Sequence, residues 1–287
     1  MSRLGVALVL SAITLVVQLI GAILSSSLSL LADSAHVLGD VASLGLAMFA
    51  AGLAGAGPST KRTFGWQRAE ILAAAVNAVI LLLASVWIVV QSVRRLLNGA
   101  ETVEPKIMLI FAAVGLIANA IAMSILHKGS HHSANVRGAF LHVVADFAGS
   151  CAVVVSAIAI LIWPTVPFDA VAAMFIALLI APRAWTLLRE TTDVLLEAVP
   201  KDVDMETVLG HMMSVESVVD VHDLHAWLIN SGKPVLSAHV VVEDNADHER
   251  ILDALGQCLA GHFDISHCTF QLESRAHRDH ENLTENF

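Results

Sequence analysis

The chain has 287 residues, of which 56% are hydrophobic and only 15% are charged, and its mean hydropathy is +0.72. A soluble domain carries about 25% charged residues, so this composition argues against an ordinary soluble protein and favours a membrane protein. The net charge of −10 argues against nucleic acid as a partner, and three scattered cysteines exclude a disulfide framework, which fits a reducing compartment.

The charges divide the chain near Pro200. Residues 1–199 contain 11 Lys/Arg and 10 Asp/Glu, a net charge of +1, whereas residues 200–287 contain 5 Lys/Arg and 16 Asp/Glu, a net charge of −11. Nine of the 14 histidines also lie in the second part. We predict a membrane domain over residues 1–199, an acidic soluble domain over residues 200–275 and a disordered tail over residues 276–287.

Five charge-free apolar runs in the first part reach the roughly 20 residues that a membrane-spanning helix needs. A sixth run, Ala170–Pro182, reaches that length when it continues through Leu188. The first run is far longer than the roughly 7–15 apolar residues of a secretory signal, so we interpret it as a span rather than a cleaved signal peptide. The predicted spans are residues 4–25, 30–55, 68–93, 106–127, 136–162 and 167–188.

Lysines and arginines in the short loops predict the orientation, because they accumulate on the cytoplasmic side. With both termini inside, the cytoplasmic side carries Arg3, Lys61, Arg62, Arg68, Lys128, Arg137, Arg183 and Arg189, and the outer side carries Arg94, Arg95 and Lys106. We therefore predict two cytoplasmic termini. The absence of a recognisable targeting peptide suits a bacterial inner membrane.

Two spans carry a histidine four residues before an aspartate: His36 and Asp40 in the second, and His142 and Asp146 in the fifth. Four residues is about one helical turn, so each pair projects from one face of its helix. The two faces together offer two imidazole nitrogens and two carboxylate oxygens, a tetrahedral set suited to Zn²⁺. An interhelical hydrogen bond explains one such pair equally well. Two identical pairs at membrane depth, where ionisable groups are costly, favour a metal site.

Three further polar residues lie in the spans. Asp33 precedes His36 by three residues on the same side of the helix. It is either a carboxylate on the entry path or behind the ligands, or a hydrated group near the membrane surface. Asn77 and Asn119 are interpreted as helix-packing hydrogen bonds rather than ligands.

The second part has helical apolar spacing over residues 203–213 and 247–261 and Val-, Ile- and Leu-rich strand patterns over residues 218–229, 235–243 and 267–273. The order αββαβ predicts a small α+β domain with helices on one face of a sheet. The predicted fold is therefore an α-helical membrane bundle of six transmembrane helices followed by a small α+β cytoplasmic domain.

Strand alternation gives an expectation for the histidines of this domain. Residues two apart share a face, so we expect His222 and Leu224 on one face and Asp223 and His225 on the other. His222 and His239 flank the hairpin and are expected to meet across it.

Several strings together resemble the cation diffusion facilitator family over residues 4–275. They are Ala32–Asp40, Arg62–Glu70, His142–Asp146, His222–Trp227, Ser237–Val240 and Thr269–Glu273. The zinc-transporter branch of that family has His-x-x-x-Asp in both spans. The resemblance implies a six-span homodimer in the lipid bilayer that exchanges Zn²⁺ for H⁺ by alternating access. It also implies a metallochaperone-like cytoplasmic domain that binds Zn²⁺ and helps to hold the dimer.

The resemblance assigns the transport site to His36, Asp40, His142 and Asp146. In the cytoplasmic domain, the positions that match regulatory metal ligands of the family are His222, His239, His267 and Glu273, with His248 matching a further ligand in some members. The remaining histidines of this domain, His211, His225, His262, His277 and His280, are interpreted as solvated or structural.

The chain departs from the family's pattern in two loops. Some members carry a metal site between spans two and three, but residues 56–70 contain no His and no Asp, so we expect none there. The long His-rich loop of other members is reduced to His127, His131 and His132, which leaves a metal-gathering role open.

Zn²⁺ needs neutral imidazole and ionised carboxylate, so metal and protons compete for the same four groups, and histidine titrates in the relevant pH range. We predict a proton-coupled exporter of Zn²⁺, with Co²⁺ and Cd²⁺ as other possible cargoes. No covalent chemistry is needed, so we expect a transporter and not an enzyme. The alternative is a membrane protein that senses Zn²⁺ in its tail without transporting it.

Overall fold

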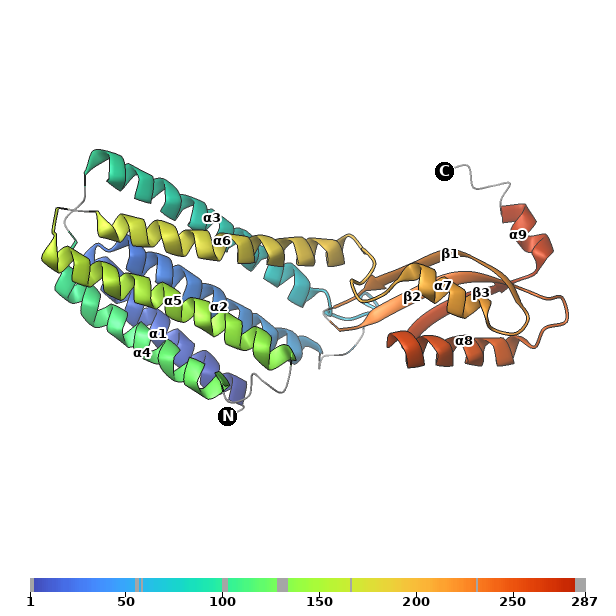
Figure 1. Ribbon diagram of the computed structural model, residues 1–287. Coiled ribbons are helices and arrows are strands. Elements are labelled where there is room, and N and C mark those ends of the chain that lie inside the picture. Colours follow the sequence, from blue (N-terminus) through green and yellow to red (C-terminus); the bar gives the residue numbers. More distant parts are fainter. Residues whose placement is uncertain are drawn as a thin grey trace. The chain divides into compact units, whose positions relative to one another are not determined.

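The computed structural model describes residues 3–54, 57, 59–99, 103–127, 134–165, 167–230 and 232–281 (Figure 1). The described chain divides into two compact units. The first comprises residues 1–56 and 73–189, and the second comprises residues 57–72 and 190–287.

Six long helices occupy the first part of the described chain, as predicted. They are α1 (Arg3–Ser25), α2 (Leu28–Ala54), α3 (Ala69–Asn98), α4 (Pro105–His127), α5 (Ala134–Ile162) and α6 (Phe168–Leu195). Three described stretches are long and apolar enough to cross a membrane by length and composition: Ala69–Asn98, Val143–Ile162 and Phe168–Leu195. Helices α3 and α6 continue beyond the predicted spans, because charged residues such as Arg94 and Arg189 end an apolar run without ending a helix.

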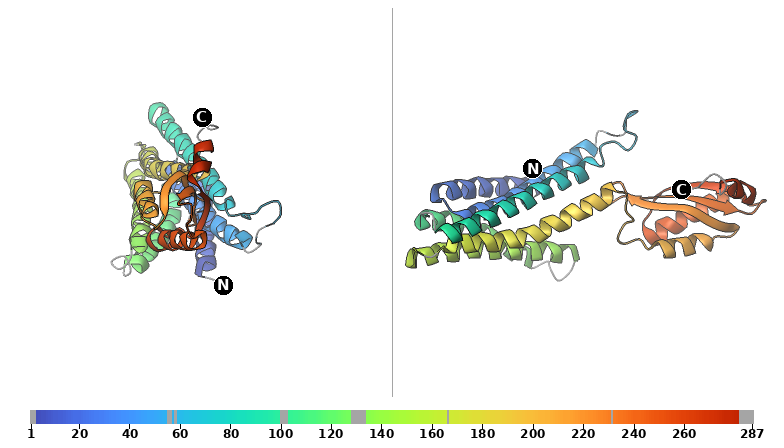
Figure 2. Two further views of the ribbon diagram at one scale, coloured as in Figure 1. Left: turned by 90° about the vertical axis from the view of Figure 1, so that its right-hand side faces the viewer. Right: turned by 90° about the horizontal axis from the view of Figure 1, so that it is seen from above.

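Helices α1, α2, α4 and α5 pack against one another, with α1 on α2 and α4, and α5 on α4 and α2 (Figures 1 and 2). Small residues such as Ala32, Ala112 and Ala157 line their shared core. Small side chains let membrane helices approach closely. At Gly21, α1 and α4 are too close for any side chain, because a Cβ atom there would lie 2.4 Å from Phe111 of α4.

The start of α2 is held by a carboxylate from α6. Asp169 accepts hydrogen bonds from the Leu28 amide at 2.7 Å, the Ser29 amide at 3.1 Å and the Ser27 hydroxyl at 2.6 Å. Arg95 of α3 donates to the same carboxylate at 3.1 Å. A negative charge on the first amides of a helix satisfies unpaired donors and interacts favourably with the helix dipole. Asp169 therefore fixes the helix that carries His36 and Asp40 against α3 and α6.

The second unit has the predicted αββαβ order. It contains α7 (Met205–Met213), β1 (Val218–Leu228), β2 (Pro234–Val242), α8 (His248–Phe263) and β3 (His267–Glu273). The sheet order is β1-β2-β3, with β1 antiparallel to β2 and β3 parallel to β2. Helices α7 and α8 cover one face of the sheet, and their buried residues form one core with the strand residues Leu236, Ala238 and Val240.

The tail was predicted to be disordered over residues 276–287, but its described part belongs to helix α9 (Arg275–Glu281). The Ser274 hydroxyl accepts a hydrogen bond from the His277 amide, as helix-capping serines do. Arg278 then pairs with Asp220 of β1 at 2.7 Å. This helix was not predicted because all its residues except Ala276 are polar, so it has no apolar periodicity. Residues 282–287 lie outside the described part of the chain.

Candidate metal sites

Three of the four predicted transport-site residues have described side chains, and the structure brings them together between α2 and α5. His36, Asp40 and Asp146 each offer one ligand atom, and these atoms lie within 4.8 Å of one another. His36 Nε2 lies 2.6 Å from Asp146 Oδ1. Their side chains are only 12% and 11% exposed. His142 lies one helical turn before Asp146 in α5, and its side chain lies outside the described residues.

Arg183 of α6 also reaches this site, with its Nη1 atom 3.2 Å from Asp146 Oδ1. In the sequence Arg183 counts only toward the positive charge of the cytoplasmic side. The structure instead makes it a partner of a predicted ligand, so one Asp146 oxygen faces both an imidazole and a guanidinium group. A buried carboxylate needs such partners because an unpaired charge at this depth is strongly unfavourable.

Asp33 lies behind the site and is 2% exposed within the protein. Gln18 of α1 donates to its Oδ2 atom at 2.6 Å, and Ser150 of α5 donates at 3.3 Å. Asn119 of α4 donates to the Ser150 hydroxyl at 3.0 Å, so this network joins four helices. Of the two interpretations left open for Asp33, its burial favours the carboxylate behind the ligands. Gly115 makes room for the network, because a Cβ there would lie 2.2 Å from Gln18 Nε2.

A small cavity of about 10 Å³ borders Asp33, His36, Asp146 and Arg183. That volume is about one water-sized sphere. Little free space therefore remains beside the His36–Asp146 contact.

The second cluster lies on the sheet face that α7 and α8 leave uncovered. His222 and His239 are paired across β1 and β2, and their ring centroids are 5.2 Å apart. Glu273, which is 3% exposed, places Oε1 2.8 Å from His239 Nδ1 and Oε2 3.6 Å from His222 Nε2. The expected meeting of the two histidines is confirmed, and Glu273 joins them from β3. Two imidazoles and one carboxylate form a donor set that suits Zn²⁺.

The expected alternation in β1 is wrong at Asp223. This residue has a φ of +47°, and the pairing with β2 shifts register between His222 and His225. Such a bulge inserts one extra residue, so the faces of the strand exchange after it. Leu224 packs with the core, while the Asp223 carboxylate lies 3.7 Å from His239 Nε2. Asp223 is therefore a second carboxylate beside the cluster that strand alternation did not predict.

His225 approaches Asp223 at 2.7 Å. This hydrogen bond, assisted by the positive charge of nearby imidazoles, holds the pKa of the Asp223 carboxyl below its ordinary value. A lowered pKa favours the ionised carboxylate, which is the form that a cation requires.

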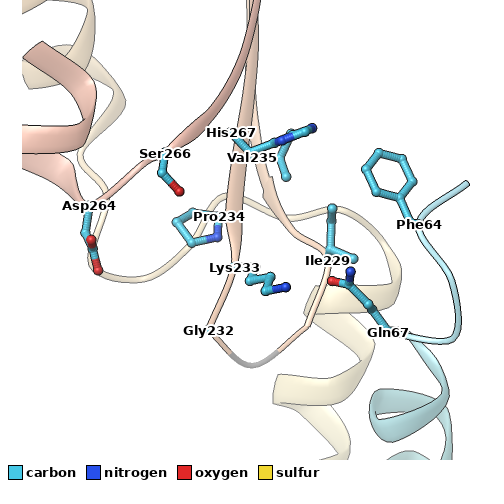
Figure 3. Close-up of a pocket in the computed structure, with 10 residues that line it drawn as sticks. All are labelled: Phe64, Gln67, Ile229, Gly232, Lys233, Pro234, Val235, Asp264, Ser266 and His267. Carbon is cyan, nitrogen blue, oxygen red and sulfur yellow. The ribbon is translucent and has the colours of Figure 1, made fainter. Parts of the chain in front are cut away.

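The structure does not bring His248 and His267 into this cluster. His248 is exposed at the first turn of α8. His267 pairs with Val235 at the opposite end of β3, six residues from Glu273, or roughly 20 Å at the rise of a strand. Figure 3 shows His267 in a pocket beside Phe64, with the two ring centroids 6.0 Å apart.

Comparison with known proteins gives two family matches that cover almost the entire chain. The cation efflux transmembrane domain matches residues 4–196, and the cytoplasmic domain of cation efflux proteins matches residues 200–275. The chain is 39% identical over 271 residues to the metal cation efflux system protein CzcD of Cupriavidus metallidurans, covering 94% of this chain and 85% of that protein.

Other relatives have similar coverage. The zinc transporter ZitB of Escherichia coli is 36% identical over 261 residues, which are 90% of this chain and 83% of that protein. The cadmium, cobalt and zinc/H⁺-K⁺ antiporter of Bacillus subtilis is 33% identical over 273 residues, 93% and 87% of the two chains. The solved metal-bound C-terminal domain of CzcD is 40% identical, covers 25% of this chain and 99% of that domain, and has a TM-score of 0.24.

Proposed function

The chain belongs to the cation diffusion facilitator family of cation efflux proteins, and on that premise we propose that it exports Zn²⁺ from the cytosol in exchange for protons. The observation that carries this proposal is the contact of 2.6 Å between His36 and Asp146, which joins α2 to α5 at membrane depth. Relatives whose names include zinc transport and a proton antiport support the same cargo and coupling.

The His36–Asp146 contact provides a mechanism that couples Zn²⁺ transport to proton transport. A nitrogen and a carboxylate oxygen at 2.6 Å share a proton, whichever of the two atoms holds it. Zn²⁺ needs the lone pairs of both atoms, so it can enter only when this proton leaves. At the near-neutral cytosolic side the proton is lost and the ion is bound. At a more acidic outer side the proton returns and the ion is released.

Arg183 and Asp33 prepare the site for this exchange. Arg183 offsets the Asp146 charge when no ion is bound, and it must give way when a divalent cation takes its place. Asp33 carries a further carboxylate behind His36, held by Gln18 and Ser150. Both side chains line the small cavity beside the ligands. The proposed cargo is Zn²⁺, with Co²⁺ and Cd²⁺ as ions that the same nitrogen and oxygen donors accept.

We further propose that His222, His239 and Glu273 bind a regulatory Zn²⁺ in the cytoplasmic domain, for which their donor set and spacing are suited. A bound ion there would offset part of the net charge of −11 over residues 200–287 and favour association of two acidic domains in a homodimer. In this proposal both termini are cytoplasmic, the membrane is a bacterial inner membrane, and the protein performs no covalent chemistry.

Zn²⁺ flux into proteoliposomes under an imposed pH gradient tests the proposal. The proposed exporter accumulates Zn²⁺ inside vesicles whose lumen is the more acidic, and it stops when the gradient is collapsed with an ionophore. A channel would give flux that does not depend on which side is acidic. A sensor would bind Zn²⁺ and give no flux above that of empty vesicles. Asp146→Asn should give no flux, and the exposed Asp244→Asn is the matched control.

A further inference from the structure

A third group of metal-binding side chains lies on the helical layer of the cytoplasmic domain. His211 comes from α7, and Cys258 and His262 come from α8. Their ligand atoms lie within 4.8 Å of one another. We propose that these three residues form a separate metal site for a thiophilic divalent cation such as Zn²⁺. The sequence alone favours a solvated or structural role for both histidines, but the fold brings His211 beside Cys258 and His262.

The spacing of the ligand atoms fits one ion. Cys258 and His262 are four residues apart on α8, so both side chains project from one face of that helix. The Cys258 sulfur lies 3.7 Å from His211 Nδ1. Two ligands of a tetrahedral Zn²⁺ with bonds of about 2.3 Å to sulfur and about 2.1 Å to nitrogen lie about 3.6 Å apart. The observed separation therefore needs almost no adjustment for the two atoms to share an ion.

The histidine rings are also held in orientations that suit metal binding. His262 Nδ1 lies 3.0 Å from the backbone carbonyl of Cys258. A carbonyl oxygen only accepts, so Nδ1 carries the hydrogen and Nε2 keeps the lone pair that a metal requires. Histidine ligands commonly donate their second ring N–H to a backbone carbonyl in this way. His211 packs edge-on against Phe263, with ring centroids 5.2 Å apart, and its ring lies 4.7 Å from that of His262.

This site is distinct from the cluster of His222, His239 and Glu273. Helices α7 and α8 pack on one face of the sheet, and the His222 cluster lies on the other. The donor set also differs, because it contains a thiolate. His211 and Cys258 are half-buried and His262 is exposed. Three protein ligands with one exposed side leave a fourth position open to water or to an incoming ligand, as in non-structural zinc sites.

The cysteine ligand allows this site to be distinguished by absorption spectroscopy from the other two proposed metal sites. When Co²⁺ replaces Zn²⁺, a sulfur ligand gives an intense charge-transfer absorption in the near ultraviolet, which nitrogen and oxygen ligands do not give. The proposed transport and sheet sites contain no sulfur ligand. The purified full chain titrated with Co²⁺ should therefore develop this band, and Cys258→Ser should abolish it. Cys151→Ser and Cys268→Ser are the matched controls and should retain it. Persistence of the band in Cys258→Ser would overturn the site.

Thiol reactivity provides a second measurement that does not depend on a variant of Cys258. Zn²⁺ should slow alkylation of Cys258 by N-ethylmaleimide, because a metal-bound thiolate is no longer a free nucleophile. Peptide mass spectrometry reads Cys258 beside Cys151 and Cys268 in the same sample. His211→Ala and His262→Ala should each weaken the protection by roughly tenfold or more in Zn²⁺ concentration, since loss of even an outer metal-site partner costs about 10–100-fold in affinity. Equal alkylation of Cys258 with and without Zn²⁺ would exclude the proposed site.

Discussion

His36 Nε2 and Asp146 Oδ1 lie 2.6 Å apart, and their hydrogen bond joins α2 to α5. Both atoms belong to the predicted ligand set, so the contact that holds the two helices together without metal is also the contact that a metal must replace. The guanidinium group of Arg183 also donates a hydrogen bond to Asp146 Oδ1, at 3.2 Å.

Asp146→Asn tests the need for the carboxylate. Asparagine keeps the shape of the side chain and can still hydrogen-bond to His36, but it cannot offer an anionic ligand. We expect Zn²⁺ affinity at the transport site to fall at least about tenfold, because loss of even an outer metal-site partner costs about 10–100-fold. Calorimetric titration of the full chain measures this in a background of His222→Ala, His239→Ala and Cys258→Ser, which removes the two proposed cytoplasmic sites, with exposed Asp244→Asn as control. Unchanged affinity would remove Asp146 from the ligand set.

Replacement of His36 tests selectivity. His36→Asp changes the predicted set from two nitrogens and two oxygens to one richer in oxygen, which admits larger ions more readily. We expect the ratio of Cd²⁺ to Zn²⁺ flux in proteoliposomes to rise. A ratio equal to or below that of the unmodified protein would argue against a direct bond from His36 to the cargo.

Arg183→Gln tests the competing cation. Glutamine retains a hydrogen-bond donor for Asp146 but removes the positive charge that Zn²⁺ must displace. We expect tighter Zn²⁺ binding and slower release on the acidic side, so that binding improves while flux declines. Weaker Zn²⁺ binding in this variant would show instead that Arg183 organises the ligands rather than competing with the ion.

Asp169→Asn tests the attachment of α2. The Asp169 carboxylate accepts from the Leu28 and Ser29 amides and from Arg95. Loss of its charge should destabilise the fold by about 1–3 kcal/mol, the range for a buried polar group deprived of a charged partner. Thermal unfolding in detergent checks this against the exposed Asp202→Asn, which should unfold at the same temperature as the unmodified chain. Equal stability of both variants would mean that Asp169 does not anchor α2.

Metal binding by the sheet cluster predicts a difference among histidines of the cytoplasmic domain. Zn²⁺ should raise the unfolding temperature of the full chain, because a ligand that binds only the folded state stabilises it. The increase should be smaller in His239→Ala, whereas His248→Ala and His267→Ala should keep it, since neither residue belongs to the group formed by His222, His239 and Glu273. A loss of the increase in His267→Ala alone would place the regulatory ion elsewhere.

The parts of the fold that follow from periodicity were predictable from the sequence. The six helices and the αββαβ order follow from apolar runs and strand patterns, and the structure has both. The distance between His267 and Glu273 was also predictable, because six residues of strand span roughly 20 Å. The family resemblance nevertheless assigned His267 and Glu273 to the same set of metal ligands, because it matches each sequence position separately and ignores the distance between them.

Two features of the sites were not predictable, for physical reasons. Strand alternation assumes a regular backbone, and the positive φ of Asp223 breaks it within β1. Aspartate adopts this conformation more readily than most residues, but nothing local in the sequence requires it. The sequence places Arg183 among the cytoplasmic charges. It does not show how far the long arginine side chain extends from the backbone, or toward which residue. Pairing with Asp146 depends on how α6 packs against α5.

In the proposed mechanism Zn²⁺ and a proton exclude each other at His36 and Asp146, so the decisive quantity is the number of protons released for each Zn²⁺ that binds there. Calorimetric titration of the purified full chain in buffers of different ionisation enthalpy gives that number. A background of His222→Ala, His239→Ala and Cys258→Ser removes release from the two cytoplasmic clusters. In that background we predict at least one proton released for each Zn²⁺ bound at neutral pH, and at least about tenfold weaker binding after Asp146→Asn. Stoichiometric Zn²⁺ binding at the transport site with no proton released would show that the metal and the proton do not compete for His36 and Asp146.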